Sequence, residues 1–237
     1  MMEFRERSNA KELMDDPHMD PKLFKEAFKD INRCNNLLGG YQITIDAVMK
    51  LIKTTPKKSY TILDVGCADG AMLRKVADAL KKEEIDCKLT GIDVKEEILK
   101  IATQLSSSYD NIDYVQGDLF DTSLPLQCDI LLCTLTLHHF TDEQIHCFAK
   151  RFADLAKIGV VINDLHRSKI AYVLFNLFSI FFIKTRIGKL DGLVSIARGF
   201  TKNNLKAFAK QLPKYRHSIQ WKWAFRYVWI IKPAPIN

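Results

Sequence analysis

The sequence predicts an α/β fold: a mostly parallel sheet of seven strands that closes on an antiparallel strand pair and carries helices on both faces. Two observations favour this class. Short apolar runs rich in branched residues alternate with stretches of helical apolar spacing. Several of these runs also end in an acidic residue, as strands do along one edge of a parallel sheet. The expected arrangement is Rossmann-like, and 237 residues suit one such domain with additions.

The first strand is expected at residues 60–65, and a helix at 71–81, where apolar residues recur at helical spacing. The turn from Gly66 to Gly70 therefore joins the carboxyl end of a strand to the amino end of a helix. Glycine permits positive φ and a close approach of the backbone, and the unpaired N–H groups of the helix face a ligand. This turn is predicted to bind a polar cofactor.

Two cofactor families use a turn of this kind. The dinucleotide pattern G-x-G-x-x-G, started at Gly66, would require glycine at the positions of Ala68 and Ala71. The pattern acid-x-G-x-G-x-G is met by Asp64, Gly66 and Gly70, and departs only at Ala68. The chain therefore resembles class I S-adenosylmethionine (SAM) methyltransferases, of the broad group that includes enzymes of ubiquinone and menaquinone biosynthesis.

The resemblance covers residues 46–140 at motif level and implies a role for each motif residue. Asp64 helps to place the methionine end of SAM, the backbone of 66–70 packs against it, and Asp93 takes both ribose hydroxyls. Asp93 also suits this role chemically, because a carboxylate accepts two hydroxyl hydrogen bonds and repels a 2′-phosphate. In this family the acid after the third strand, here Asp118, holds the adenine amino group. The implied cofactor-binding residues are Asp64, Gly66, Cys67, Ala68, Gly70, Asp93, Val94, Asp118, Leu119, Thr134 and Leu135.

Later segments continue the order of strands. Residues 112–118 are expected to form the third strand, and 159–166 the fifth, with Asp164 and His166 at its carboxyl end. Residues 128–140 are similar to the fourth strand of the family, which runs on into a loop with paired histidines.

The last part of the chain fits the same plan. Thr201 is expected to cap a helix over residues 200–212. Residues 215–223 and 225–232 are expected to form the closing antiparallel pair.

A helical insert, residues 169–199, follows the fifth strand, where the family builds its substrate pocket. Its apolar run, residues 170–183, is too short to span a bilayer and too apolar to lie naked in water. Read as a helix, the run has one narrow polar stripe and basic residues at both ends. Three interpretations are open: a helix that dips into a membrane interface, a lid over an apolar substrate, and an ordinary core or dimer-interface helix.

Residues 1–40 are predicted to form a helical cap in front of the SAM-binding domain, residues 41–237. An amphipathic helix begins at Asp20-Pro21. Segments 12–16 and 35–40 resemble the leader of bacterial methyltransferases associated with aromatic polyketides and quinone-like lipids. Such a leader either closes over the cofactor mouth and excludes water or covers the sheet.

Charge is distributed unevenly along the chain, whose net charge is +7. Residues 150–237 carry 17 Lys and Arg against only three Asp, a net +14, whereas residues 1–149 are acidic. This asymmetry indicates a polyanionic partner, either nucleic acid or an anionic membrane surface, or else a solvated basic face. No N-P-P-Y-type segment follows the fourth strand and no RNA-binding module is appended, so nucleic acid is the less favoured partner.

The six cysteines show neither a C-x-x-C pair nor the spacing of metal ligands. We therefore expect reduced thiols and no metal site. The charged N-terminus does not resemble a signal peptide, and no run approaches the ~20 apolar residues of a membrane span. A cytoplasmic protein is predicted, with peripheral contact at the inner face of the membrane as an open alternative. The sequence does not indicate the oligomeric state.

The resemblance implies methyl transfer from SAM, with S-adenosylhomocysteine (SAH) as the product. The apolar insert favours a lipophilic aromatic acceptor, methylated at a phenolic oxygen. The sulfonium methyl is already electrophilic, so the protein aligns the nucleophile, excludes water and supplies one base. His166 is the first candidate base and His139 the second. Three alternatives stay open: methylation of a quinol ring carbon, methylation of RNA or protein by way of the basic third, and a SAM-fold binding subunit without turnover.

Overall fold

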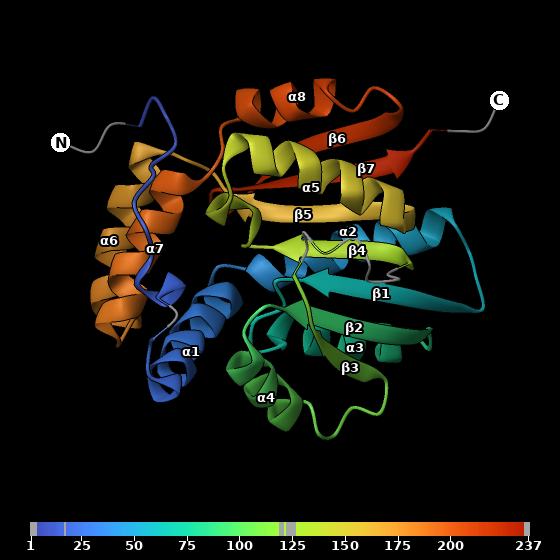
Figure 1. Cartoon of the computed structure of the whole chain (residues 1–237), viewed down its shortest axis with the longest axis horizontal. Helices are drawn as coiled ribbons and strands as arrows, with labels where there is room; N and C mark the ends of the chain where they lie inside the picture. The colour runs from blue at the N-terminus through green and yellow to red at the C-terminus, as the bar shows by residue number, and fades with distance from the viewer. Residues whose placement is uncertain (1–3, 17, 119–120, 122–126, 235–237) are drawn as a thin grey trace.

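One mixed sheet of seven strands, in the order β3-β2-β1-β4-β5-β7-β6, forms the centre of the molecule (Figure 1). In this computed structural model, residues 4–16, 18–118, 121 and 127–234 are described. β7 runs antiparallel to both of its neighbours, and the other pairs are parallel. The predicted fold class is therefore confirmed. The strands are β1 (Ser59–Val65), β2 (Asp86–Asp93), β3 (Ile112–Gln116), β4 (Cys128–Thr134), β5 (Ala156–Leu165), β6 (Tyr215–Lys222) and β7 (Arg226–Pro233).

Helices cover both faces of the sheet because alternate strand residues point to opposite sides. Ile62 of β1 joins the core cluster on one face, whereas Leu63 joins the cluster on the other. The first face is covered by α2 (Gly40–Thr54), α3 (Ala71–Lys82) and α4 (Glu96–Leu105). The second is covered by α5 (Asp142–Leu155) and α8 (Lys202–Lys210), as Figure 1 shows.

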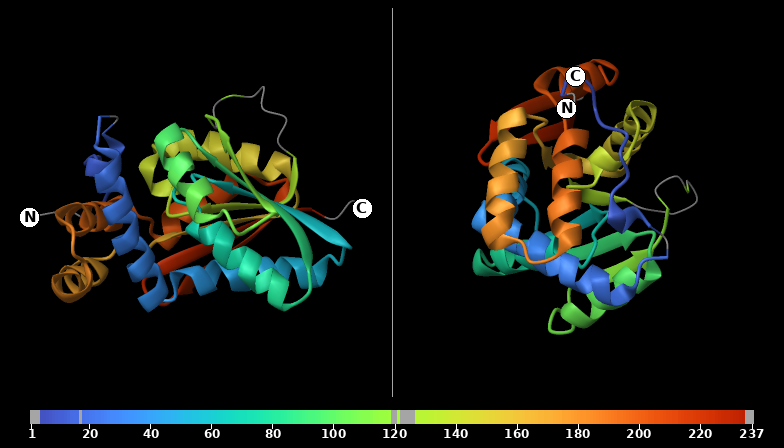
Figure 2. Two further views of the ribbon diagram at one scale, coloured as in Figure 1. Left: turned by 90° about the horizontal axis from the view of Figure 1, so that it is seen from below. Right: turned by 90° about the vertical axis from the view of Figure 1, so that its left-hand side faces the viewer.

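Three further helices stand over the carboxyl ends of the parallel strands: α1 (Pro21–Leu37), α6 (Lys169–Phe182) and α7 (Arg186–Arg198) (Figure 1). α6 and α7 lie side by side, with α1 across their ends (Figure 2). Asp30 of α1 fixes this arrangement, because its carboxylate accepts hydrogen bonds from the backbone N–H groups of Lys184 and Thr185, which join α6 to α7. These three helices, called the cap from here on, therefore face the edge of the sheet where a ligand is expected.

The insert after β5 is two helices, α6 and α7, joined by a short turn. Thr201 caps α8 as expected, since its side chain accepts a hydrogen bond from the N–H of Asn204. Asp20 likewise caps α1 by accepting from the N–H of Lys22. Within the described residues, no helix combines the length and hydropathy that crossing a bilayer demands.

Candidate active site

A cavity of about 790 Å³ lies between the carboxyl edge of the sheet and the helical cap. Its walls come from the β1–α3 turn, the ends of β2, β4 and β5, the cap helices and the turn between β6 and β7. On the cap side the lining is aromatic, with Phe24, Phe28, Phe175 and Phe178. An apolar cavity at the carboxyl ends of parallel strands is the usual ligand site of an α/β sheet.

The turn after β1 has the backbone shape that the motif predicts. Gly66 and Gly70 have positive φ, 66° and 74°. A Cβ at Gly66 would collide with the Thr136 side chain, and one at Gly70 with the Tyr114 hydroxyl. Both positions therefore require glycine for two reasons: the positive φ and the lack of space for a Cβ. Ala68, where the motif has glycine, adopts the same left-handed conformation with a φ of 49°, which costs an L-residue about 1 kcal/mol.

Two carboxylates face the cavity from the ends of β1 and β2. Asp64 is buried, and its Oδ1 has no hydrogen-bond partner within the described part of the chain. Burial and the nearby charge of Asp93 raise the pKa of Asp64 to about 8. Asp93 accepts hydrogen bonds from the backbone N–H groups of Ala68 (3.2 Å) and Lys95 (3.1 Å), which fix its orientation.

These two side chains fit the two ends of SAM that the motif assigns to them. A buried carboxylate oxygen without a partner suits the ammonium group of the methionine end, because a cation there would stabilise the ionised form of Asp64. Asp93, held by the backbone at the cavity wall, suits a pair of hydroxyls as acceptor.

The cavity wall gathers most of the predicted cofactor residues. Gly70 shapes the turn without lining the cavity, and Asp118 is exposed beside Gly117, which does line it. Leu119 lies outside the described residues. The roles of all these residues remain predictions. Those that line the cavity are Asp64, Gly66, Cys67, Ala68, Asp93, Val94, Thr134 and Leu135.

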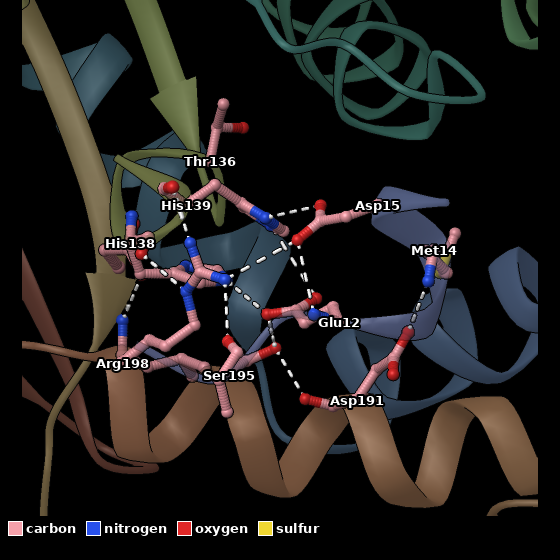
Figure 3. A network of polar contacts seen from close by, with 12 residues as sticks. Glu12, Met14, Asp15, Thr136, His138, His139, Asp191, Ser195 and Arg198 are labelled. Carbon is pink, nitrogen blue, oxygen red and sulfur yellow. Dashed lines mark hydrogen bonds and ion pairs between the residues drawn. The ribbon is translucent and has the colours of Figure 1, made fainter. Parts of the chain in front are cut away.

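His138 is the centre of a buried polar network at the cavity wall (Figure 3). It lies on a short 3₁₀ helix, η2 (Leu137–His139), directly after β4. Its Nδ1 is 2.7 Å from Oδ1 of Asp164, and its Nε2 is 3.3 Å from Oε1 of Glu12. Burial by itself would lower the pKa of His138, but the two carboxylates raise it to about 9. His138 is therefore a cation at neutral pH, with Asp164 and Glu12 as counter-ions.

His139 lines the same cavity and differs in its surroundings. Its Nδ1 lies 3.1 Å from Oδ1 of Asp15. Burial alone would raise the pKa of Asp15, but the hydrogen bond and charge of His139 lower it to about 2, so Asp15 is ionised and accepts a hydrogen bond from Nδ1–H. This pairing selects the tautomer in which Nε2 of His139 is the basic nitrogen. Glu12 lies 3.7 Å from that nitrogen.

His166, the first candidate base from the sequence, does not line the cavity. Side chains alternate at the end of β5, and because Leu165 lines the cavity, His166 points to the opposite side. There it packs against Tyr227, with ring centroids 5.0 Å apart, and its Nδ1 accepts a hydrogen bond from Trp221. This placement argues against His166 as the base and leaves His139 in contact with the cavity.

Little in the sequence indicated the acidic residues that surround the two histidines. Glu12 and Asp15 come from η1 (Leu13–Asp15) and the residue before it, more than 120 positions from the histidines. Asp191 of α7 holds this segment by accepting hydrogen bonds from the N–H groups of Leu13 and Met14 (Figure 3). The only signal was that segment 12–16 resembles a methyltransferase leader.

A metal ion is sterically compatible with part of this network, which the sequence did not indicate. The carboxylate of Glu12 and one ring nitrogen each of His138 and His139 lie within 4.8 Å of one another. Binding a metal would require His138 to lose its proton, and its raised pKa opposes that step. The ion pair between Glu12 and His138 accounts for the same geometry without a metal.

Known proteins match both the sequence and the fold. Residues 62–159 match the family model described as a methyltransferase domain. The Bacillus subtilis (strain 168) protein YqeM, whose methyltransferase name is itself provisional, is 31% identical over 133 residues. That alignment covers 54% of this chain and 51% of YqeM, so the match spans about half the length of the curated relative.

Solved structures extend the likeness over most of the chain. The plantazolicin methyltransferase BpumL in complex with SAH aligns with a TM-score of 0.65 and 17% identity, over 90% of this chain and 95% of BpumL. Magnesium protoporphyrin IX methyltransferase (ChlM) from Synechocystis PCC 6803, also with SAH, aligns with a TM-score of 0.55 and 15% identity, over 82% and 84%.

Residues 62–159 match a methyltransferase domain, and the chain has the fold of SAM-dependent methyltransferases of class I. The family predicted from the sequence agrees with these matches, and the neighbours BpumL and ChlM bind SAH, the product of the predicted cofactor. The family match runs from within β1 to the first residues of β5, and the structural alignment with BpumL extends over 90% of the chain.

Proposed function

We propose that the protein is a methyltransferase that transfers the methyl group of SAM to a phenolic oxygen of a lipophilic aromatic small molecule. One observation carries the proposal: the glycine turn and a set of aromatic side chains line one cavity, and His139 is also in its wall. A structural neighbour from Planctomyces limnophilus is described in complex with apigenin, and BpumL with a pentazolic desmethylPZN analogue. These complexes support an organic small molecule or peptide as the substrate of this fold.

The residues of the β1–α3 turn bind and orient the cofactor in this proposal. SAM supplies an electrophilic methyl group. Asp64 pairs with the ammonium of its methionine end, Asp93 accepts from the ribose hydroxyls, and the backbone at Gly66 packs against the ligand. The cap excludes water, since Phe24 and Phe28 of α1 close the cavity on the side of the cofactor turn.

His139 removes the phenolic proton in this proposal. A phenol has a solution pKa of about 10, so it is mostly neutral at pH 7.5 and benefits from a base at hydrogen-bond distance. Nε2 of His139 accepts the proton, and Asp15, bonded to Nδ1, stabilises the imidazolium that forms.

The test compares His139→Gln with His166→Gln on the same phenolic acceptor. We expect His139→Gln to lower kcat by about 10² or more and to leave SAH affinity within twofold. A nitrophenol that is already ionised at pH 8 should be methylated by this variant nearly as fast as by the wild type, because it needs no base. His166→Gln should retain activity. Loss of activity in His166→Gln alone would contradict this assignment.

We also propose that the protein is cytoplasmic and contacts the inner face of an anionic membrane through α6. The outward face of this helix is apolar apart from Asn176, and its Phe181 is 81% exposed. Lys169, Lys184 and Arg186 lie at the two ends of the helix. Leu174 is exposed on the same face and also lines the cavity, which suits an acceptor that arrives from a bilayer. The exposed apolar residues of α6 are Ile170, Val173, Leu174, Leu177, Ile180, Phe181 and Phe182.

A further inference from the structure

Arg226, the first residue of β7, places a buried guanidinium group in the wall of the cavity. Arg226 as a whole residue is only 3% exposed. Nη1 has no hydrogen-bond partner within the described part of the chain. A buried donor without an acceptor is costly, and in a ligand cavity it indicates a polar group of the ligand.

The surrounding structure holds this guanidinium in one position. Nη2 donates a hydrogen bond to Oδ1 of Asn35 on α1, at 2.7 Å. Gly40, the first residue of α2, lies directly against the group: a Cβ there would be 2.9 Å from both Cζ and Nη2 of Arg226. Asn35 and Gly40 are the two ends of segment 35–40, whose sequence resembles a methyltransferase leader. They form a cradle that leaves Nη1 as the free end.

Within the described residues, no carboxylate forms an ion pair with Arg226. The acidic groups near it are Cys34, Tyr41 and Asp164. Burial raises the pKa values of Cys34 and Tyr41, so both are neutral. Asp164 is committed to His138, and its Oδ1 also accepts from the N–H of Leu165. Burial lowers the pKa of Arg226, but a guanidinium remains charged in proteins.

The position of Arg226 places its ligand in the acceptor half of the cavity. β7 is separated from β1 by β4 and β5, which puts the two strands about 14 Å apart at the usual strand spacing. Asp64 and the glycine turn at the end of β1 form the cofactor half. A carboxylate is a natural partner for a fixed, partly satisfied guanidinium. Two carboxylates could reach the cavity, that of the acceptor and that of the methionine end of SAM.

We propose that Arg226 binds a carboxylate of the acceptor, so that the substrate is a lipophilic aromatic acid rather than a neutral phenol. This inference rests on the proposed function for the aromatic character of the acceptor. The Asn35–Gly40 cradle positions the guanidinium, and Nη1 donates to the carboxylate. The carboxylate thereby pairs with a buried cation of the cavity wall that has no ion-pair partner among the described residues.

The test measures binding, with SAH present, of two matched probes: a hexyl-substituted salicylate and the hexylphenol that lacks only the carboxylate. We expect the wild type to bind the salicylate at least about tenfold more tightly. Arg226→Gln should abolish this preference and leave the SAH affinity within twofold. Asn35→Ala keeps the charge but loosens the cradle, and should reduce the preference only in part.

Two results would overturn the inference. The first is equal affinity of the wild type for the two probes, which requires no variant to fold. The second is a preference that survives in Arg226→Gln; if SAH affinity falls in the same variant, the guanidinium holds the cofactor carboxylate instead. Methylation of neither probe, with the binding preference intact, would contradict the proposed function and not the role of Arg226.

Discussion

At the scale of single residues, Asp64 couples proton binding to cofactor binding. Its pKa in the free protein is raised from 3.8 to about 8 by burial and by Asp93, so the side chain is protonated at pH 7. An ammonium group beside Oδ1 would favour the ionised form. Binding of the cofactor product should therefore expel the proton.

We predict that SAH binding at pH 7 releases close to one proton and that its affinity rises with pH up to about 8. The rise cannot exceed tenfold per pH unit, since one group is involved. Calorimetric titration in two buffers of different ionisation enthalpy measures the release directly. Asp64→Asn is the control, because it cannot ionise, and it should bind SAH more weakly without a proton release. Zero release in the wild type would refute the pairing.

The sequence predicted the residues whose roles are local and missed those whose roles depend on tertiary contacts. The glycine turn and Asp93 are set by their own strands and turns, and they lie where the motif places them. His166 was predicted to face the ligand because the sequence indicates where the strand ends. The sequence does not indicate which side of the strand faces the ligand. Leu165 occupies the cavity side, and so His166 points away.

At the scale of elements, the cap is held to the domain by buried polar side chains. Asp191 of α7 accepts from the N–H groups of Leu13 (2.8 Å) and Met14 (2.9 Å) and so fixes η1 over the histidines. Arg198, also on α7, donates to the carbonyl oxygens of His138 and His139. Helix boundaries follow from capping residues and apolar spacing. The contacts between the cap and the histidines join segments far apart in the chain, and no local pattern predicts them.

We predict that Asp191→Ala loosens the N-terminal segment, because it leaves two backbone N–H groups without their acceptor at a local cost of about 1–3 kcal/mol. Amide hydrogen exchange at Leu13 and Met14 should accelerate by about tenfold to a hundredfold. Asp142→Ala is the matched control, since that carboxylate is largely exposed and contacts the Arg7 side chain rather than the N–H groups of Leu13 and Met14. Equal exchange at Leu13 and Met14 in Asp191→Ala and the wild type would show that Asp191 does not hold the segment.

At the scale of the whole molecule, part of the basic surplus of the last third is used internally. Arg167 is buried and donates to the carbonyl oxygens of Phe4 and Arg5, and Arg198 binds the carbonyls beside the histidines. The cations around α6 lie instead beside an exposed apolar face. The sequence predicted the apolar run but not which of its side chains face the cavity and which face outward. The structure turns Phe175 and Phe178 into the cavity and leaves Phe181 outside.

We predict that anionic phosphatidylserine vesicles sediment the protein at low salt and that phosphatidylcholine vesicles do so far less. Leu177→Asp with Phe181→Asp should abolish sedimentation, because both side chains lie on the outward face of α6. Leu105→Asp, at an exposed apolar residue of α4, is the matched control and should sediment like the wild type. Retention of the α6 variant on the vesicles would contradict membrane contact through this helix.

The central claim is that the glycine turn and its two carboxylates bind SAM, and a calorimetric titration of the full chain with SAH tests it most directly. We predict micromolar binding of SAH and no binding of NAD under the same conditions. Asp93→Ala should weaken SAH by about 2–4 kcal/mol through the loss of two charge-assisted hydrogen bonds. Failure of the wild type to bind SAH, or binding of NAD in its place, would contradict the account.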